Sequence, residues 1–108
     1  MIAVAEAPSR EASAESRFER LKDEWKQESQ YLCNTTQMAM LRSYQQIIGL
    51  GPSVLPLLLR ELAREPDHWF WALEAIAGQN PVPAEAVGNV SAMAEAWSAW
   101  GRREGLLT

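Results

Sequence analysis

The chain has 108 residues, of which 47% are hydrophobic and 22% charged, and these values are typical of one soluble domain with its own core. Its net charge is −4 and no basic run occurs, which argues against a protein that grips the phosphate backbone of nucleic acids. The single cysteine excludes an internal disulfide and suggests a reducing compartment.

Residues 1–13 are rich in Ala, Glu and Ser without helical periodicity, and we expect a mobile tail there. A helical domain is predicted to follow over residues 14–106. Its first helix should span residues 13–32, because apolar side chains recur along one narrow stripe, at Phe18, Leu21, Trp25 and Leu32. The charged remainder of this helix, which includes Lys22 and Lys26, is predicted to face solvent.

Two further helices are predicted in the middle of the chain. Residues 34–36 can cap a helix over residues 37–48, and Pro52 can open the next one over residues 52–64. The second of these helices has a broad apolar face, formed by Val54, Leu55, Leu58, Leu59 and Leu62. Leu57 lies off that face, so this helix is expected to pack on two sides.

The stretch PDHWFWALEAI follows, and it predicts a fourth helix over residues 67–77 with Asp67 as its N-cap. On a helical wheel Trp69 and Phe70 fall on the core face. Trp71 falls on the opposite face, in the same sector as His68 and Glu74. Two placements of this indole are open. It packs under a neighbouring element, most simply the N-terminal helix, or it is exposed to solvent for a partner, as tryptophans in binding hot spots are.

The last helix should span residues 90–104, with Asn89 as its cap and with Trp97 and Trp100 on its core face. Helical periods, prolines and glycines account for the whole chain, and no segment predicts a strand. The sequence therefore predicts an all-α fold, a single compact helical domain of about five helices.

A resemblance to a known architecture lies in residues 47–78. "GLGPSVLPLLLREL" with Pro56, the turn "EPD" and "WALEAIAG" resemble one HEAT-type helical repeat. The resemblance implies a HEAT-like helical hairpin with flanking helices as caps, because one such repeat cannot bury its apolar face alone. The longer pattern "YQQIIGLG", "PDHWFWAL" and "MAEAW" is similar to a group of small bacterial all-helical proteins. That likeness implies a helical fold and adds no catalytic residues.

No catalytic, cofactor-binding or metal-binding residue is predicted, and no cofactor is expected. One histidine and one cysteine without a spacing motif do not make a metal site. Catalysis by His68 would require Asp67, Glu74 or Glu85 to meet it in a cleft. The candidate partner-binding residues are instead His68, Trp71, Glu74 and Leu57.

These observations favour a non-catalytic protein-interaction module, such as a bacterial adaptor or an antitoxin-like or immunity-like partner of another protein. One alternative is a small enzyme that uses His68 with nearby carboxylates. Another is a weak nucleic-acid binder through Trp100, Arg102 and Arg103, which the acidic total makes an unlikely partner class. Self-association as a homodimer through Trp71 or Leu57 is a further option. No membrane partner is predicted, and the expected location is the cytoplasm.

Overall fold

The computed structural model describes the backbone of residues 10–107 and the side chains of residues 14–107. It has six α-helices in this range: α1 Arg10–Ser29, α2 Thr35–Met40, α3 Arg42–Gly49, α4 Leu55–Arg64, α5 Phe70–Ala77 and α6 Val90–Arg103. Two 3-10 turns, Gly51–Val54 and Ala84–Ala86, join α3 to α4 and precede α6. No strand lies in residues 10–107, so the prediction of a single all-α domain is confirmed.

The predicted tail over residues 1–13 falls mostly outside the described residues, and α1 begins at Arg10. The residues of the predicted helix 37–48 are helical except at Leu41, where a break divides them between α2 and α3, so the prediction of one continuous helix is wrong. At this break the backbone turns extended, with φ −61° and ψ 143°. The Gln45 side chain donates to the Ala39 carbonyl at 2.7 Å and so satisfies a carbonyl that the break leaves free. The predicted cap at Asn34 is confirmed, since its side chain accepts from the Gln37 N–H at 3.1 Å.

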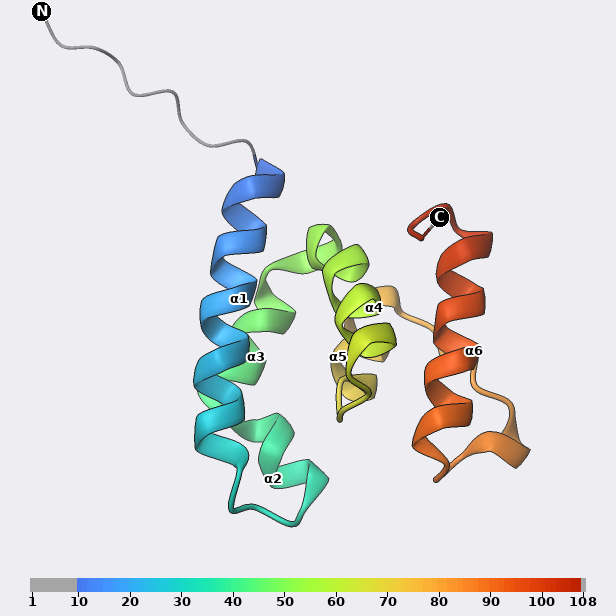
Figure 1. Cartoon of the computed structure of the whole chain (residues 1–108), viewed down its shortest axis with the longest axis horizontal. Helices are drawn as coiled ribbons and strands as arrows, with labels where there is room; N and C mark the ends of the chain where they lie inside the picture. Colours follow the sequence, from blue (N-terminus) through green and yellow to red (C-terminus); the bar gives the residue numbers. More distant parts are fainter. Residues whose placement is uncertain (1–9, 108) are drawn as a thin grey trace, which may run out of the picture.

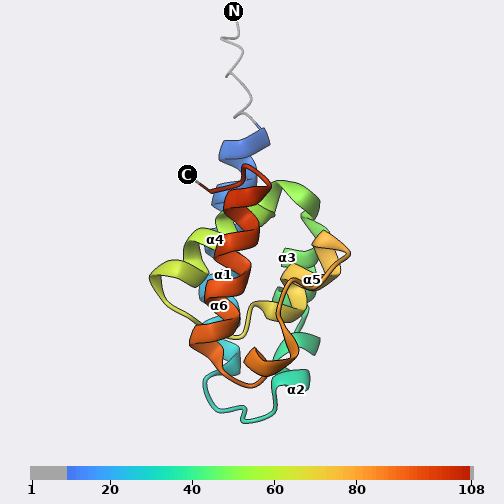
Figure 2. The ribbon, with the colours of Figure 1, turned by 90° about the vertical axis from the view of Figure 1, so that its right-hand side faces the viewer.

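The helices stand side by side, and Figure 1 shows their order across the molecule. α1 lies against α3 on one side, α4 and α5 lie in the middle, and α6 packs against α4 on the other side. Figure 2 shows the same arrangement from the side of α6, with α5 and α2 beyond the loop that leads into α6. The helix α5 is therefore flanked by α3 on one side and by α4 on another.

An aromatic cluster holds α1, α3 and the start of α5 together. Its centre is Trp69, which is fully buried. The Trp69 ring lies 4.5 Å from that of Trp25, 5.8 Å from that of Tyr44 and 6.0 Å from that of Phe18, measured between centroids. Such aromatic pairs contribute stability beyond their buried area, so this cluster links α1 firmly to α3 and to the start of α5.

A second contact, between α4 and α6, carries the C-terminal part of the core. Trp97 and Trp100 are both buried, and their rings meet edge to face at 5.2 Å. Gly101 lets α6 approach α4 closely, because a Cβ atom at this position would stand 2.7 Å from Leu59 Cδ1. The prediction that Trp97 and Trp100 belong to the core is confirmed.

The prediction that Lys22 faces solvent is wrong. Lys22 is 6% exposed, and its ammonium group donates to the buried carboxylate of Glu61 on α4 at 3.1 Å. Arg64 donates to both oxygens of that carboxylate at 2.8 Å, and Lys26 lies 3.4 Å from it. Glu19 is a second partner of Lys22 at 2.7 Å. The Lys22 ammonium nitrogen also lies 5.8 Å from the centre of the Phe18 ring, and a long aliphatic stem allows a lysine to occupy such a place beside apolar side chains.

This ion cluster predicts a specific loss of stability in acid. Burial raises the pKa of Glu61, but the hydrogen bonds from Arg64 and Lys22 outweigh it and hold that pKa below the ordinary value of 4.5. A lowered folded-state pKa stabilises the fold fully above the unfolded-state value, and this contribution is lost as the pH falls through the folded-state pKa. We therefore expect urea unfolding to show a steeper loss of stability between about pH 6 and about pH 3 in the wild type than in Glu61→Gln. Parallel losses in the two proteins would contradict this account.

Candidate functional site

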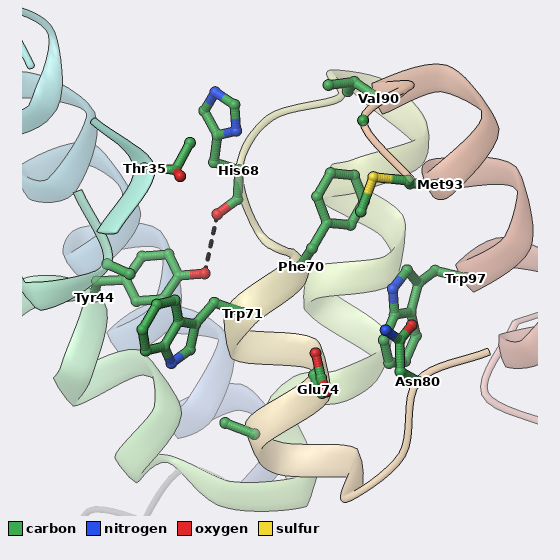
Figure 3. A pocket seen from close by; sticks show the side chains of 13 residues that line it. Thr35, Tyr44, His68, Phe70, Trp71, Glu74, Asn80, Val90, Met93 and Trp97 are labelled. Atoms are coloured by element: carbon green, nitrogen blue, oxygen red, sulfur yellow. Dashed lines mark hydrogen bonds between the residues drawn. The ribbon is translucent and has the colours of Figure 1, made fainter. Parts of the chain in front are cut away.

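A pocket of about 670 Å³ opens on the side of α5 that faces away from the core, between α2 and the first half of α6. We call it the α5 groove. Its apolar lining consists of Ala39, Phe70, Trp71, Ala75, Gly88, Val90, Met93 and Trp97. Its polar lining consists of Thr35, Tyr44, His68, Glu74 and Asn80, and Figure 3 shows how these side chains lie. A mostly apolar concavity with a few polar groups is the usual form of a binding site.

The two faces of α5 explain why this surface is left open. Ala72 and Leu73 are buried with Trp69 on the core face, as a 3.6-residue period requires. Trp71 falls on the other face and is 46% exposed. The preferred placement of Trp71 under the N-terminal helix is therefore wrong, and its exposed placement is confirmed. The physical reason is that Trp69 already occupies the space beside α1, with its ring against that of Trp25.

The start of α5 is fixed by Tyr44, which reaches it from α3. The Tyr44 hydroxyl donates to the His68 carbonyl and accepts from the Ala72 N–H, both at 2.9 Å. An N-cap side chain normally accepts from such a first-turn N–H, so Tyr44 supplies this acceptor from another helix. The prediction that Asp67 caps the helix is wrong: Trp69 is the N-cap residue, and the Asp67 carboxylate accepts from the His68 N–H at 2.8 Å.

The Tyr44 hydroxyl is an anchor rather than a reactive group. Burial raises its pKa well above the ordinary range, although the hydrogen bond from the Ala72 N–H lowers it in part. The hydroxyl therefore stays protonated at neutral pH, and both of its hydrogen bonds go to the backbone. This arrangement sets the direction of α5 and, with it, the position of Trp71.

Removal of this hydroxyl is expected to lower the stability of the fold and to make the start of α5 more mobile. Tyr44→Phe leaves the Ala72 N–H and the His68 carbonyl without their partner, and a lost buried partner costs about 1–3 kcal/mol. Chemical unfolding measures this loss. Amide exchange at Ala72 should accelerate in the variant, and unchanged protection at this position would contradict the assigned anchor role.

The structure brings together three of the four predicted partner-binding residues. His68, Trp71 and Glu74 all line the α5 groove. Leu57 lies elsewhere, on α4, where it is partly buried against the hydrophobic core. The wheel had already grouped the first three on one face. A wheel of one helix could not show that α2 and α6 would lie on either side of that face.

The groups that catalysis would need are dispersed. His68 and Glu74 share the groove, but no hydrogen bond joins them, and Figure 3 shows the imidazole and the carboxylate well apart along it. Asp67 and Glu85 do not line the groove. Within residues 10–107 no three His, Cys, Asp or Glu side chains gather closely enough to hold a metal ion.

The surface proposed for stacking on a nucleic-acid base is also not available. Trp100 is 5% exposed and packs against Trp97, while Arg102 and Arg103 at the end of α6 are exposed. A base could reach this indole only if α6 moved away from α4. The two arginines therefore lack the aromatic platform that single-strand binding requires.

Sequence reasoning missed the walls of the groove that come from distant segments. Trp97 was assigned to the core face of the last helix, and it also borders the groove, together with Val90 and Met93 from the first half of α6. The Trp97 Nε1–H is buried and has no hydrogen-bond partner among the described residues. No pattern within α6 distinguishes a side chain that covers the core from one that also lines a groove.

No protein-family model, curated protein or solved structure matches this chain. The geometry of the groove is therefore the basis on which a function can be argued. In the part of the chain that the structure describes, no helix is long and apolar enough to cross a membrane.

Proposed function

We propose that this protein is a non-catalytic protein-interaction module that binds another protein through the α5 groove. The observation that carries the proposal is the 46% exposure of Trp71 in a mostly apolar concavity. Tryptophan contributes strongly to binding when a partner covers it, and the exposed half of the Trp71 residue packs against nothing in the free domain. A partner that covers Trp71 would remove this apolar surface from water.

The distribution of exposed apolar side chains supports this site. Among residues 14–107, the large hydrophobic residues that are exposed are Tyr31, Met40, Trp71, Val87 and Val90. Trp71 and Val90 line the groove, and Met40 and Val87 directly adjoin the lining residues Ala39 and Gly88 in the chain. Apolar residues gathered in this way on a monomer are typical of an interaction surface.

Further features of the proposal rest on the sequence. The chain would be a cytoplasmic bacterial adaptor, or an antitoxin-like or immunity-like protein that covers a partner. Its α4 and α5 would form a HEAT-type hairpin, with the N-terminal helices α1 to α3 as the cap before it and α6 as the cap after it. A homodimer through the same groove would be the simplest form of self-association.

A small enzyme is the second candidate, because His68 and Glu74 line one groove. General acid–base catalysis needs its groups within hydrogen-bond reach of one substrate, directly or through water. Turnover of ester, amide or phosphate model substrates that is lost in His68→Gln would favour this candidate over the interaction module.

The leading proposal predicts that Trp71→Ala abolishes partner binding without unfolding the protein. The side chain is half exposed, so the change in unfolding free energy should stay within about 1 kcal/mol. Tagged wild type should capture a stoichiometric partner from the source cells, and Trp71→Ala should lose it. Tyr31→Ala is the matched control, since Tyr31 is 87% exposed and does not line the groove. Capture of the same partner by wild type and Trp71→Ala would refute the proposed site.

A further inference from the structure

We infer that the occupant of the α5 groove is a cationic amphipathic helix of another protein, with its apolar face on Trp71 and Met93 and with Lys or Arg side chains facing Glu74. This inference rests on the proposed function and goes beyond it by naming the chemistry of the partner. Three observations support it: the charges around the groove, the exposure of Glu74 without an ion-pair partner, and the helical backbone around the groove.

The elements around the groove carry acidic charges and almost no basic ones. Residues 65–101, which contain α5, the loop after it and most of α6, have no Lys or Arg. The acidic residues in this range are Glu65, Asp67, Glu74, Glu85 and Glu95. Residues 31–41, which contain α2, have no charged side chain, and Arg42 is the sole basic residue of α3. Complementary charge on a partner would speed its association and exclude acidic competitors.

Glu74 is the carboxylate placed to meet such a partner. It is exposed, it lines the groove beside Trp71, and it forms no ion pair within the described residues. Three other acids, on α1, on α4 and just after α4, differ in this respect. Glu19, Glu61 and Glu65 are each paired with a base from α1 or α4. Among residues 14–107 the Glu74 carboxylate is therefore free of an intramolecular base, and because it is exposed a cation from outside can reach it.

The backbone around the groove favours a helix as the occupant. No strand lies in residues 10–107, so an extended peptide would find no sheet edge with which to pair its N–H and C=O groups. A helix satisfies its own backbone and needs to present side chains alone. Ala75, one turn after Trp71 on α5, leaves space for a second helix to approach closely. The walls formed by α2 and α6 would then lie on either side of it.

Two synthetic peptides test the inference directly. Both have about 14 residues and the same leucine positions at helical spacing, and they differ in carrying either Lys or Glu at all polar positions. Titration calorimetry at low salt should show binding of the Leu/Lys peptide and none of the Leu/Glu peptide. Affinity should fall by about tenfold or more in Glu74→Lys and should weaken with added salt. Glu24→Lys on the exposed face of α1 is the matched control and should bind nearly as the wild type does.

The outcomes separate this inference from the proposed function. If a neutral Leu/Gln peptide binds as tightly as the Leu/Lys peptide and Trp71→Ala abolishes both, the groove is an interaction site and the charge inference is wrong. Equal weakening by Glu74→Lys and Glu24→Lys would mean attraction to the overall negative charge and would also overturn it. A dimer in light scattering that Trp71→Ala dissociates would assign the groove to a second copy instead. If no peptide binds, and Trp71→Ala still captures the partner that the wild type captures, both the inference and the proposed site fail.

Discussion

Trp69→Ala is expected to lower the free energy of unfolding by about 3–5 kcal/mol, as truncation of a buried tryptophan does. The indole is fully buried and lies within 6.0 Å of three aromatic rings, those of Phe18, Trp25 and Tyr44. Its removal leaves a cavity at the point where α1 and α3 meet α5. Urea unfolding followed by circular dichroism measures the loss.

Trp71→Ala makes the same chemical change two residues away and serves as the control. Its side chain is 46% exposed and packs outside the core, so its cost should be far smaller. The contrast between neighbouring tryptophans tests the assignment of the two faces of α5. Similar losses for Trp69→Ala and Trp71→Ala would show that the helix presents a different face to the core.

Glu61→Gln is expected to cost about 3 kcal/mol, because it leaves the buried ammonium group of Lys22 with one partner fewer. Glu19 stays within 2.7 Å of Lys22 and limits the loss. The double variant Lys22→Met with Glu61→Leu removes both charges and keeps the volume nearly constant. Replacing a buried ion pair in this way is often neutral or stabilising, so the double variant should be more stable than Glu61→Gln.

Comparing the single and double variants shows whether Glu61→Gln destabilises the fold because it leaves the Lys22 charge without its partner. If the double variant is less stable than the single one, the packing around Lys22 and Glu61 is more important than their charges. That result would contradict the role given to this cluster in joining α1 to α4. Lys22 and Glu61 are 39 positions apart in the sequence, so their contact forms only when α1 and α4 come together in the folded chain.

Helical periodicity was sufficient to predict most of the fold. The stripe of Phe18, Leu21 and Trp25 and the alternation of Trp69 and Trp71 on α5 are local patterns, and the structure follows both. The break at Leu41 could not be predicted because the residue is neither Gly nor Pro. It is accompanied by the hydrogen bond from the Gln45 side chain to the Ala39 carbonyl and by the packing of α3 against α1, and neither forms a local sequence signal.

The candidate site was predictable in part, because helical periodicity determines the face of α5 but not the helices that surround it. The wheel placed His68, Trp71 and Glu74 on one outward face, and all three line the groove. Tyr44 and Trp97 join them from helices that are distant in sequence, so their position in the groove is a result of tertiary packing. Lys22 shows the opposite case: the sequence predicts that this charged residue faces solvent, but it is buried against Glu61 from another helix.

The central claim is that Trp71 alone among the five tryptophans presents its ring to solvent, in the groove offered to a partner. Their indole N–H groups can be followed individually in a proton–nitrogen spectrum of the folded monomer, in the presence of a soluble paramagnetic gadolinium chelate. The account predicts strong broadening of the Trp71 indole signal and persistence of the signals from Trp25, Trp69, Trp97 and Trp100. A Trp71 signal as well protected as that of Trp69 would contradict the account, because the groove would then be closed or already covered.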